Sequence, residues 1–78
     1  MRKVFVEVVV RHSTDGKKTP LYIKWEDGRK FIIDKVIDST RAASLKAGGR
    51  GTRYRCRICG KETYLWQDDD GKWFVEAK

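Results

Sequence analysis

The chain has 78 residues, 40% of them hydrophobic, and its 18 lysines and arginines outweigh 11 aspartates and glutamates to give a net charge of +7. This length indicates one small domain over residues 1–78. Such a domain buries only about 60% of its unfolded surface, so we expect a binding module with no catalytic residues and no cofactor rather than an enzyme. No segment approaches the ~18 to 20 uninterrupted apolar residues that span a bilayer, so no membrane contact is expected.

The first segment starts with basic residues and continues with an apolar run from Val4 to Val10, an order also found in secretory signals. Glu7 interrupts this run and no small-residue cleavage site follows, which indicates the first strand of a cytoplasmic protein. Alternation places Phe5 on one face and the valines on the other, and we expect the valine face to be buried. That face consists of Val4, Val6, Val8 and Val10.

The same period of two continues through the chain, with β-branched and aromatic residues between glycines. It predicts five further strands, at residues 21–26, 31–37, 52–58, 61–67 and 72–77. Asp-Gly and similar pairs accept the positive φ angles of tight primed turns, so we predict such turns in four hairpins. They are Asp15-Gly16, Asp27-Gly28, Cys59-Gly60 and Asp70-Gly71.

The longest connection, residues 39–51, joins two predicted three-stranded meanders. Ser39 or Thr40 is a suitable helix cap and Gly48 a suitable C-terminal residue, so residues 39–48 form either a short helical turn or a flexible loop. Closure removes the exposed edges of a flat sheet. Six short strands with one longer connection therefore predict an all-β fold, a small six-stranded barrel.

The basic residues gather in one part of the sequence. Residues 39–61 contain seven bases and no acid, so they carry the entire net charge of +7. Arg53, Arg55 and Arg57 fall on one face of a predicted strand, and arginine forks match phosphate oxygens. We therefore predict that this strand and the glycine-rich loop before it bind the phosphate backbone of nucleic acid, DNA or RNA. The predicted binding residues are Arg41, Lys46, Arg50, Arg53, Arg55, Arg57 and Lys61.

Two other interpretations of this charge remain open. The arginines can form a solvated face that pairs with acids of a neighbouring strand, for which Glu62 and residues 68–70 are suitable. They can also bind an acidic protein partner, which makes the chain a protein–protein interaction or adaptor module that uses an exposed strand edge or an aromatic patch. The sequence leaves the oligomeric state open.

The chain has three tryptophans, three tyrosines and three phenylalanines. Trp25 and Trp73 alternate with aliphatic residues, so we expect both inside the barrel. Exposed aromatic rings in small barrels can stack on nucleic-acid bases. The candidates for surface exposure and base stacking are Tyr22, Tyr64, Trp66 and Phe74.

The cysteine motif of residues 54–61 resembles the opening hairpin of a classical zinc finger with two cysteines and two histidines. Such a finger needs two histidines further along the chain, whereas His12 precedes the motif. In a continuous strand Cys56 and Cys59 point to opposite faces, so we expect no metal and a small buried Cys56. If the turn lies at residues 57–58 instead, the thiols converge, and a metal site of Cys56 and Cys59 is the alternative.

Turn residues and core aromatic residues also follow a recurrent order. The relevant positions are Trp25-Glu26-Asp27-Gly28-Arg29-Lys30-Phe31, Gly48-Gly49, Arg53-Tyr54, Gly60-Lys61 and Trp73-Phe74. Over about residues 20–76 the chain resembles a family of small, uncharacterised bacterial SH3-like barrels, which implies an SH3-like barrel fold. Such relatives are often encoded near DNA-repair polymerases, so the resemblance also implies a link to nucleic acids, and it supplies no binding residues.

Overall fold

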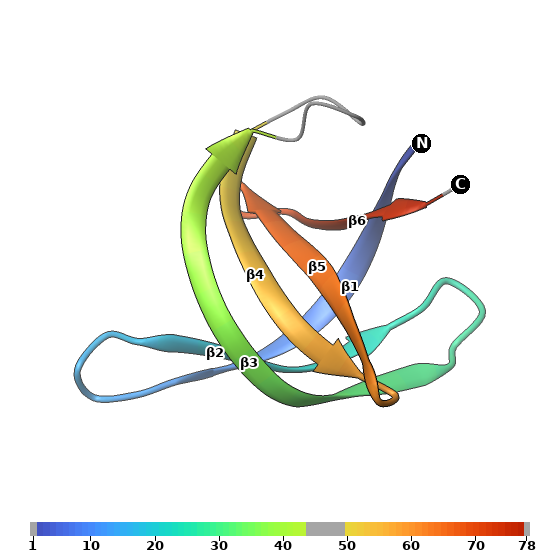
Figure 1. Cartoon of the computed structure of the whole chain (residues 1–78), viewed down its shortest axis with the longest axis horizontal. Coiled ribbons are helices and arrows are strands. Elements are labelled where there is room, and N and C mark those ends of the chain that lie inside the picture. Colours follow the sequence, from blue (N-terminus) through green and yellow to red (C-terminus); the bar gives the residue numbers. More distant parts are fainter. Residues whose placement is uncertain (1, 44–49, 78) are drawn as a thin grey trace.

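Six β-strands make up most of the computed structural model, which describes residues 2–43 and 50–77 (Figure 1). The strands are β1 (Arg2–His12), β2 (Lys18–Lys24), β3 (Lys30–Ala43), β4 (Arg50–Ile58), β5 (Lys61–Asp68) and β6 (Trp73–Ala77). Each strand predicted from the period of two is present, so the all-β prediction is confirmed. The described residues form no helix that is long and apolar enough to cross a membrane.

The strands follow one another around a closed barrel in chain order, and every paired neighbour is antiparallel. β1 closes the barrel against β6, with Val4 opposite Val75. β3 and β4 form the longest pairing and curve together around one side of the molecule (Figure 1). This direct pairing joins the two predicted meanders into one six-stranded barrel.

Residues 39–43 continue β3 instead of starting a helix. Ser39 pairs with Tyr54 and Thr40 with Arg53, as parts of the ladder between β3 and β4. The helical interpretation of residues 39–48 is therefore wrong for residues 39–43, and residues 44–48 lie outside the described part. The ladder gives the backbone groups of this stretch regular partners, and this outweighs the local capping preference.

Three hairpin turns have a different geometry from the predicted primed turns. In the first, the Gly16 N–H donates to the Ser13 carbonyl at 3.0 Å, and the Ser13 N–H donates to the Lys17 carbonyl at 3.0 Å. Gly16 has a φ of 86°, and the turns at Gly28 and Gly71 repeat the hydrogen bonds and the positive φ. These are three-residue loops, in which a type I turn precedes one left-handed residue. The primed-turn prediction is wrong at these three positions because the preceding aspartates do not have positive φ.

The barrel interior is filled by side chains that alternate inward along the strands. Its buried cluster consists of Ile23, Ile33, Tyr54, Cys56, Leu65 and Trp73. Val4 is buried, and Val6, Val8 and Val10 are partly buried and pack against this cluster. The predicted valine face is thus confirmed.

Trp73 is inside the barrel as expected, whereas Trp25 is half-buried and lies outside the buried cluster. β2 ends at Lys24, so Trp25 belongs to the following turn and not to a strand. Its ring contacts Phe31 edge-on at a centroid distance of 6.4 Å. The alternation with aliphatic residues therefore does not place Trp25 inside the barrel.

Candidate nucleic-acid interface

The arginine row of β4 lies on the outer face of the barrel. Tyr54 and Cys56 belong to the buried cluster, and successive residues of a strand point to opposite faces, so the intervening arginines point outward. Arg53 and Arg55 are half-buried and Arg57 is exposed. The predicted alternation of the row is confirmed.

Arg53 lies on an aromatic surface provided by β5. Its guanidinium carbon is 4.5 Å from the centroid of the Tyr64 ring and 6.0 Å from that of Trp66. Trp66 is the direct cross-strand neighbour of Arg53, and Tyr64 is two residues away on the same face. Arginine above an aromatic ring is attracted by the ring quadrupole. Arg53 and Tyr64 thus form one patch that combines a cation with an aromatic ring.

Arg55 and Arg57 differ in their acidic neighbours. Arg55 forms an ion pair with Asp38 of β3, with Nη2 and Oδ2 2.7 Å apart and both side chains partly exposed. Arg57 lies between Lys35 and Glu62 in the ladder, and no salt bridge of Arg57 occurs within the described part of the chain. Only part of the row is therefore neutralised by neighbouring strands.

The other predicted bases do not join this row. Arg41 and Arg50 lie near the end of the barrel where β3 meets the start of β4, and Arg41 pairs with Asp69 at 2.9 Å. Lys61 opens β5 at the opposite end of β4. Lys46 lies outside the described residues. The six described bases of residues 39–61 are thus distributed over three places on the barrel.

Tyr64 is 41% exposed, as expected for a stacking candidate, and Tyr22 is half-buried with the Lys30 ammonium 5.4 Å from its ring centroid. Trp66 and Phe74 are 3% and 0% exposed, so the expectation that both lie at the surface is wrong. The rings of these two residues stack on each other, with centroids 5.8 Å apart. They are therefore not accessible to a base.

The burial of Trp66 and Phe74 is explained by their neighbours on the outer face. The register aligns Phe5, Phe74 and Trp66 across β1, β6 and β5. Lys3 lies 4.6 Å above the Phe74 ring, and the Trp66 indole N–H donates to Glu76 Oε1 at 3.1 Å. This cover is built from three strands, so no alternation within one strand could reveal it.

Phe5 is an exposed aromatic residue that the sequence analysis did not single out. It is 53% exposed and contacts Phe74 edge-on at 6.0 Å. Its position on the strand face opposite the valines was the signal in the sequence that could have indicated its exposure. Among the described residues, the aromatic side chains classed as exposed are therefore Phe5 and Tyr64, which lie at either end of the buried pair.

Cys56 lies in β4, and Cys59 lies in the turn between β4 and β5. Cys59 and Gly60 both have positive φ, 53° and 76°, which is the predicted primed turn. Cys56 is buried in the core and Cys59 is exposed at the turn. Burial raises the pKa of the Cys56 thiol to about 11. The described residues contain no group of three or more histidine, cysteine, aspartate or glutamate side chains that could hold a metal ion.

Comparison with protein-family models, curated proteins and solved structures gives no match to this chain. The structure itself establishes the six-stranded antiparallel barrel. What the barrel binds must be inferred from the chemistry of its surface.

Proposed function

We propose that this chain is a non-enzymatic cytoplasmic module of the bacterial SH3-like type, and that it binds the phosphate backbone of nucleic acid through the outer face of β4 and β5. The observation that carries the proposal is the half-buried Arg53 on the exposed Tyr64, with the guanidinium carbon 4.5 Å from the ring centroid. The exposed Arg57 lies further along the same face of β4 and has no salt bridge among the described residues. Single-stranded nucleic acids are bound without sequence preference by such combinations of cations and accessible aromatic rings.

Each side chain has a separate role in this proposal. The exposed face of Tyr64 offers a surface on which one base can stack. Arg53 and Arg57 offer guanidinium groups to the flanking phosphates. Arg53 Nε and Arg55 Nε are buried and have no hydrogen-bond partner in the described part of the protein, so a small rotation toward a phosphate oxygen would satisfy a donor that is otherwise unmet. Because phosphates and stacking surfaces carry little sequence information, weak sequence preference is expected.

The state of each arginine sets the expected salt dependence. Arg53 and Arg57 are free of acidic partners among the described residues, whereas Arg55 must first leave Asp38. Two to three phosphate contacts, at about −0.7 for each contact of a single strand, give a slope of log K against log salt of roughly −1.4 to −2.1. The expected binding is therefore modest and moderately dependent on salt.

Titration of labelled single- and double-stranded oligonucleotides at several salt concentrations tests the proposal. Arg53→Gln with Arg57→Gln should weaken binding and reduce the slope to between zero and about −0.7, the lower value if Arg55 keeps a phosphate contact. Lys24→Gln with Lys30→Gln removes the same charge from exposed positions of β2 and β3 and serves as the matched control. Equal weakening by both double variants would show attraction by net charge alone and would refute the proposed interface.

A second candidate function is a protein-interaction module, and it is favoured by a free strand edge. β5 pairs with β6 only at Trp66 and Gln67 among the described residues, so residues 61–65 of β5 have an unpaired edge on that side. An extended peptide can add to such an edge, and acidic side chains on it would meet the same arginines. Absence of oligonucleotide binding together with binding of an acidic peptide would favour this candidate.

A further inference from the structure

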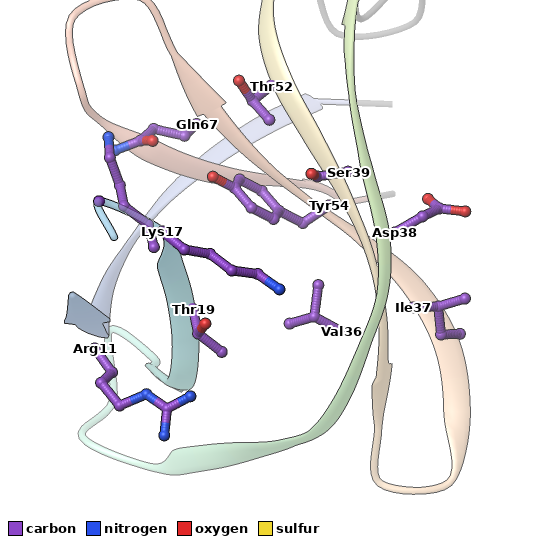
Figure 2. A pocket seen from close by; sticks show the side chains of 12 residues that line it. Arg11, Lys17, Thr19, Val36, Ile37, Asp38, Ser39, Thr52, Tyr54 and Gln67 are labelled. Atoms are coloured by element: carbon purple, nitrogen blue, oxygen red, sulfur yellow. The ribbon is translucent and has the colours of Figure 1, made fainter. Parts of the chain in front are cut away.

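A hollow of about 590 Å³ lies between the hairpin of β1 and β2 and the pair formed by β3 and β4 (Figure 2). It exists because β2 pairs with β3 through three residues only, from Tyr22 to Lys24. Before Tyr22 in β2 and after Ile32 in β3, the two strands are no longer paired with each other and diverge. Its volume falls within the ~300–1,000 Å³ typical of sites for small ligands.

One wall of the hollow is the polar end of the barrel interior. Ser39, Thr52, Tyr54 and Gln67 project toward it from β3, β4 and β5 (Figure 2). The Tyr54 ring contacts that of Trp73, with the ring centroids 5.2 Å apart. Its hydroxyl group points into the hollow (Figure 2). Burial raises the pKa of Tyr54, so its hydroxyl remains a hydrogen-bond donor at neutral pH.

The hydroxyl groups of this wall are available to a ligand. Those of Ser39, Thr52 and Tyr54 make no side-chain hydrogen bond within the described residues. Gln67 donates from its amide to the Gly71 carbonyl at 3.4 Å, which orients that side chain. The wall therefore presents three hydroxyl donors on a backbone fixed by the β3–β4–β5 ladder.

The opposite wall is basic. It is formed by Arg11, Lys17, Lys18 and Thr19 at the end of the β1–β2 hairpin. None of these three bases has a salt bridge in the described part of the chain. The acid at the margin, Asp38, has its side chain on the far side of β3 (Figure 2), where it pairs with Arg55. The hollow thus combines three cations with hydroxyl donors and has no acid directed into it among the lining residues.

We infer that this hollow is a binding site for the phosphate chain of a small ligand, either an inorganic polyphosphate or a nucleotide. The basic side chains neutralise the negative charge, and the hydroxyl groups donate hydrogen bonds to phosphate oxygens. A chain of several phosphates fits three cations better than a single phosphate does. This site is separate from the proposed nucleic-acid interface, because it faces the interior side of β3 and β4, whereas the arginine row lies on the outer face.

Calorimetric titration with phosphate, tripolyphosphate, adenosine and ATP tests the inference. Tripolyphosphate should bind at least tenfold more tightly than phosphate, and adenosine should not bind. Tighter binding of ATP than of tripolyphosphate assigns the site to a nucleotide, and equal binding assigns it to the phosphate chain alone. Absence of tripolyphosphate binding at millimolar concentration would overturn the inference.

Two variants place the binding in the hollow. The triple variant Arg11→Gln, Lys17→Gln and Lys18→Gln should lose tripolyphosphate binding by at least tenfold, and the matched triple variant carries Lys24→Gln, Lys30→Gln and Lys35→Gln. Equal losses in both would overturn the inference.

Tyr54→Phe should weaken the binding of tripolyphosphate severalfold, and the thermal midpoint of this variant checks that it is folded. Unchanged affinity in this variant would overturn the assigned role of the hydroxyl wall.

The same variants separate this inference from the proposed function. The triple variant of the hollow should keep the salt slope of oligonucleotide binding. The double variant Arg53→Gln and Arg57→Gln should keep the affinity for tripolyphosphate. Loss of both activities in either variant would show one shared anionic surface and would overturn the separate site.

Discussion

The ion pair between Asp38 and Arg55 restrains the arginine row, so removal of the acid should strengthen nucleic-acid binding. The two side chains are 52% and 40% exposed, and such exposed pairs contribute about 0.2–1 kcal/mol. Arg55 must break its ion pair with Asp38 before it binds a phosphate, and this costs the same free energy. Asp38→Asn should therefore raise the affinity for single-stranded oligonucleotide about 1.5- to 5-fold. If Arg55 then contacts a phosphate, the slope of log K against log salt steepens by about 0.7.

Fluorescence anisotropy of a labelled oligonucleotide, at several salt concentrations, measures both effects. Glu26→Gln removes one negative charge from an exposed turn and is the control for net charge. The double variant Asp38→Asn with Arg55→Gln should show no gain over Arg55→Gln alone, because the acid acts through this arginine. An equal gain in the presence and absence of Arg55, or an equal gain from Glu26→Gln, would refute the reasoning.

Three further predictions concern the fold that supports these surfaces. Gly51→Ala should destabilise the protein by about 1–3 kcal/mol and lower the thermal midpoint by about 4–8 °C per kcal/mol, because the new Cβ would clash with the backbone of β5; an unchanged midpoint would contradict the close approach. A thiol reagent should label Cys59 in the native protein and Cys56 only after denaturation, because Cys56 is buried with its pKa raised to about 11; mass spectrometry counts the labels, and rapid double labelling would contradict the packing. The backbone N–H of Arg29 donates to Asp27 and lowers the pKa of this carboxyl from its ordinary 3.8. The ionised Asp27 therefore stabilises the fold above about pH 4, and this stabilisation is lost as the pH falls through the lowered pKa. Asp27→Asn should therefore flatten the acid side of a plot of thermal midpoint against pH, and an unaltered acid side would argue against this role.

The separation of the basic residues has a functional consequence for a barrel this small. The outer row and the hollow lie on opposite faces of β3 and β4, and Asp38 lies between them, paired outward with Arg55. A substitution in one surface can therefore be tested without removing the charges of the other. The proposed nucleic-acid interface and the proposed phosphate site therefore lie on separate faces of β3 and β4.

The amino-acid sequence by itself determined the local features of this protein. A period of two specified six strands and the buried valines, and it placed Arg53, Arg55 and Arg57 on one face, because successive side chains of a strand must point to opposite sides. Glycines after an acid or a cysteine located all four hairpins. The type of turn was predicted correctly at Cys59-Gly60 alone, because loop length depends on which residues of the two strands pair.

The tertiary structure decided which of these residues are accessible and which are paired. Trp66 and Phe74 are buried because the register places them beside Phe5 under side chains from other strands. An irregularity in β3 between Val36 and Asp38 sets Asp38 opposite Arg55. The hollow arises because β2 and β3 separate after three paired residues. Register, irregularities and strand divergence depend on contacts between segments distant in sequence, so they are fixed only when the barrel closes.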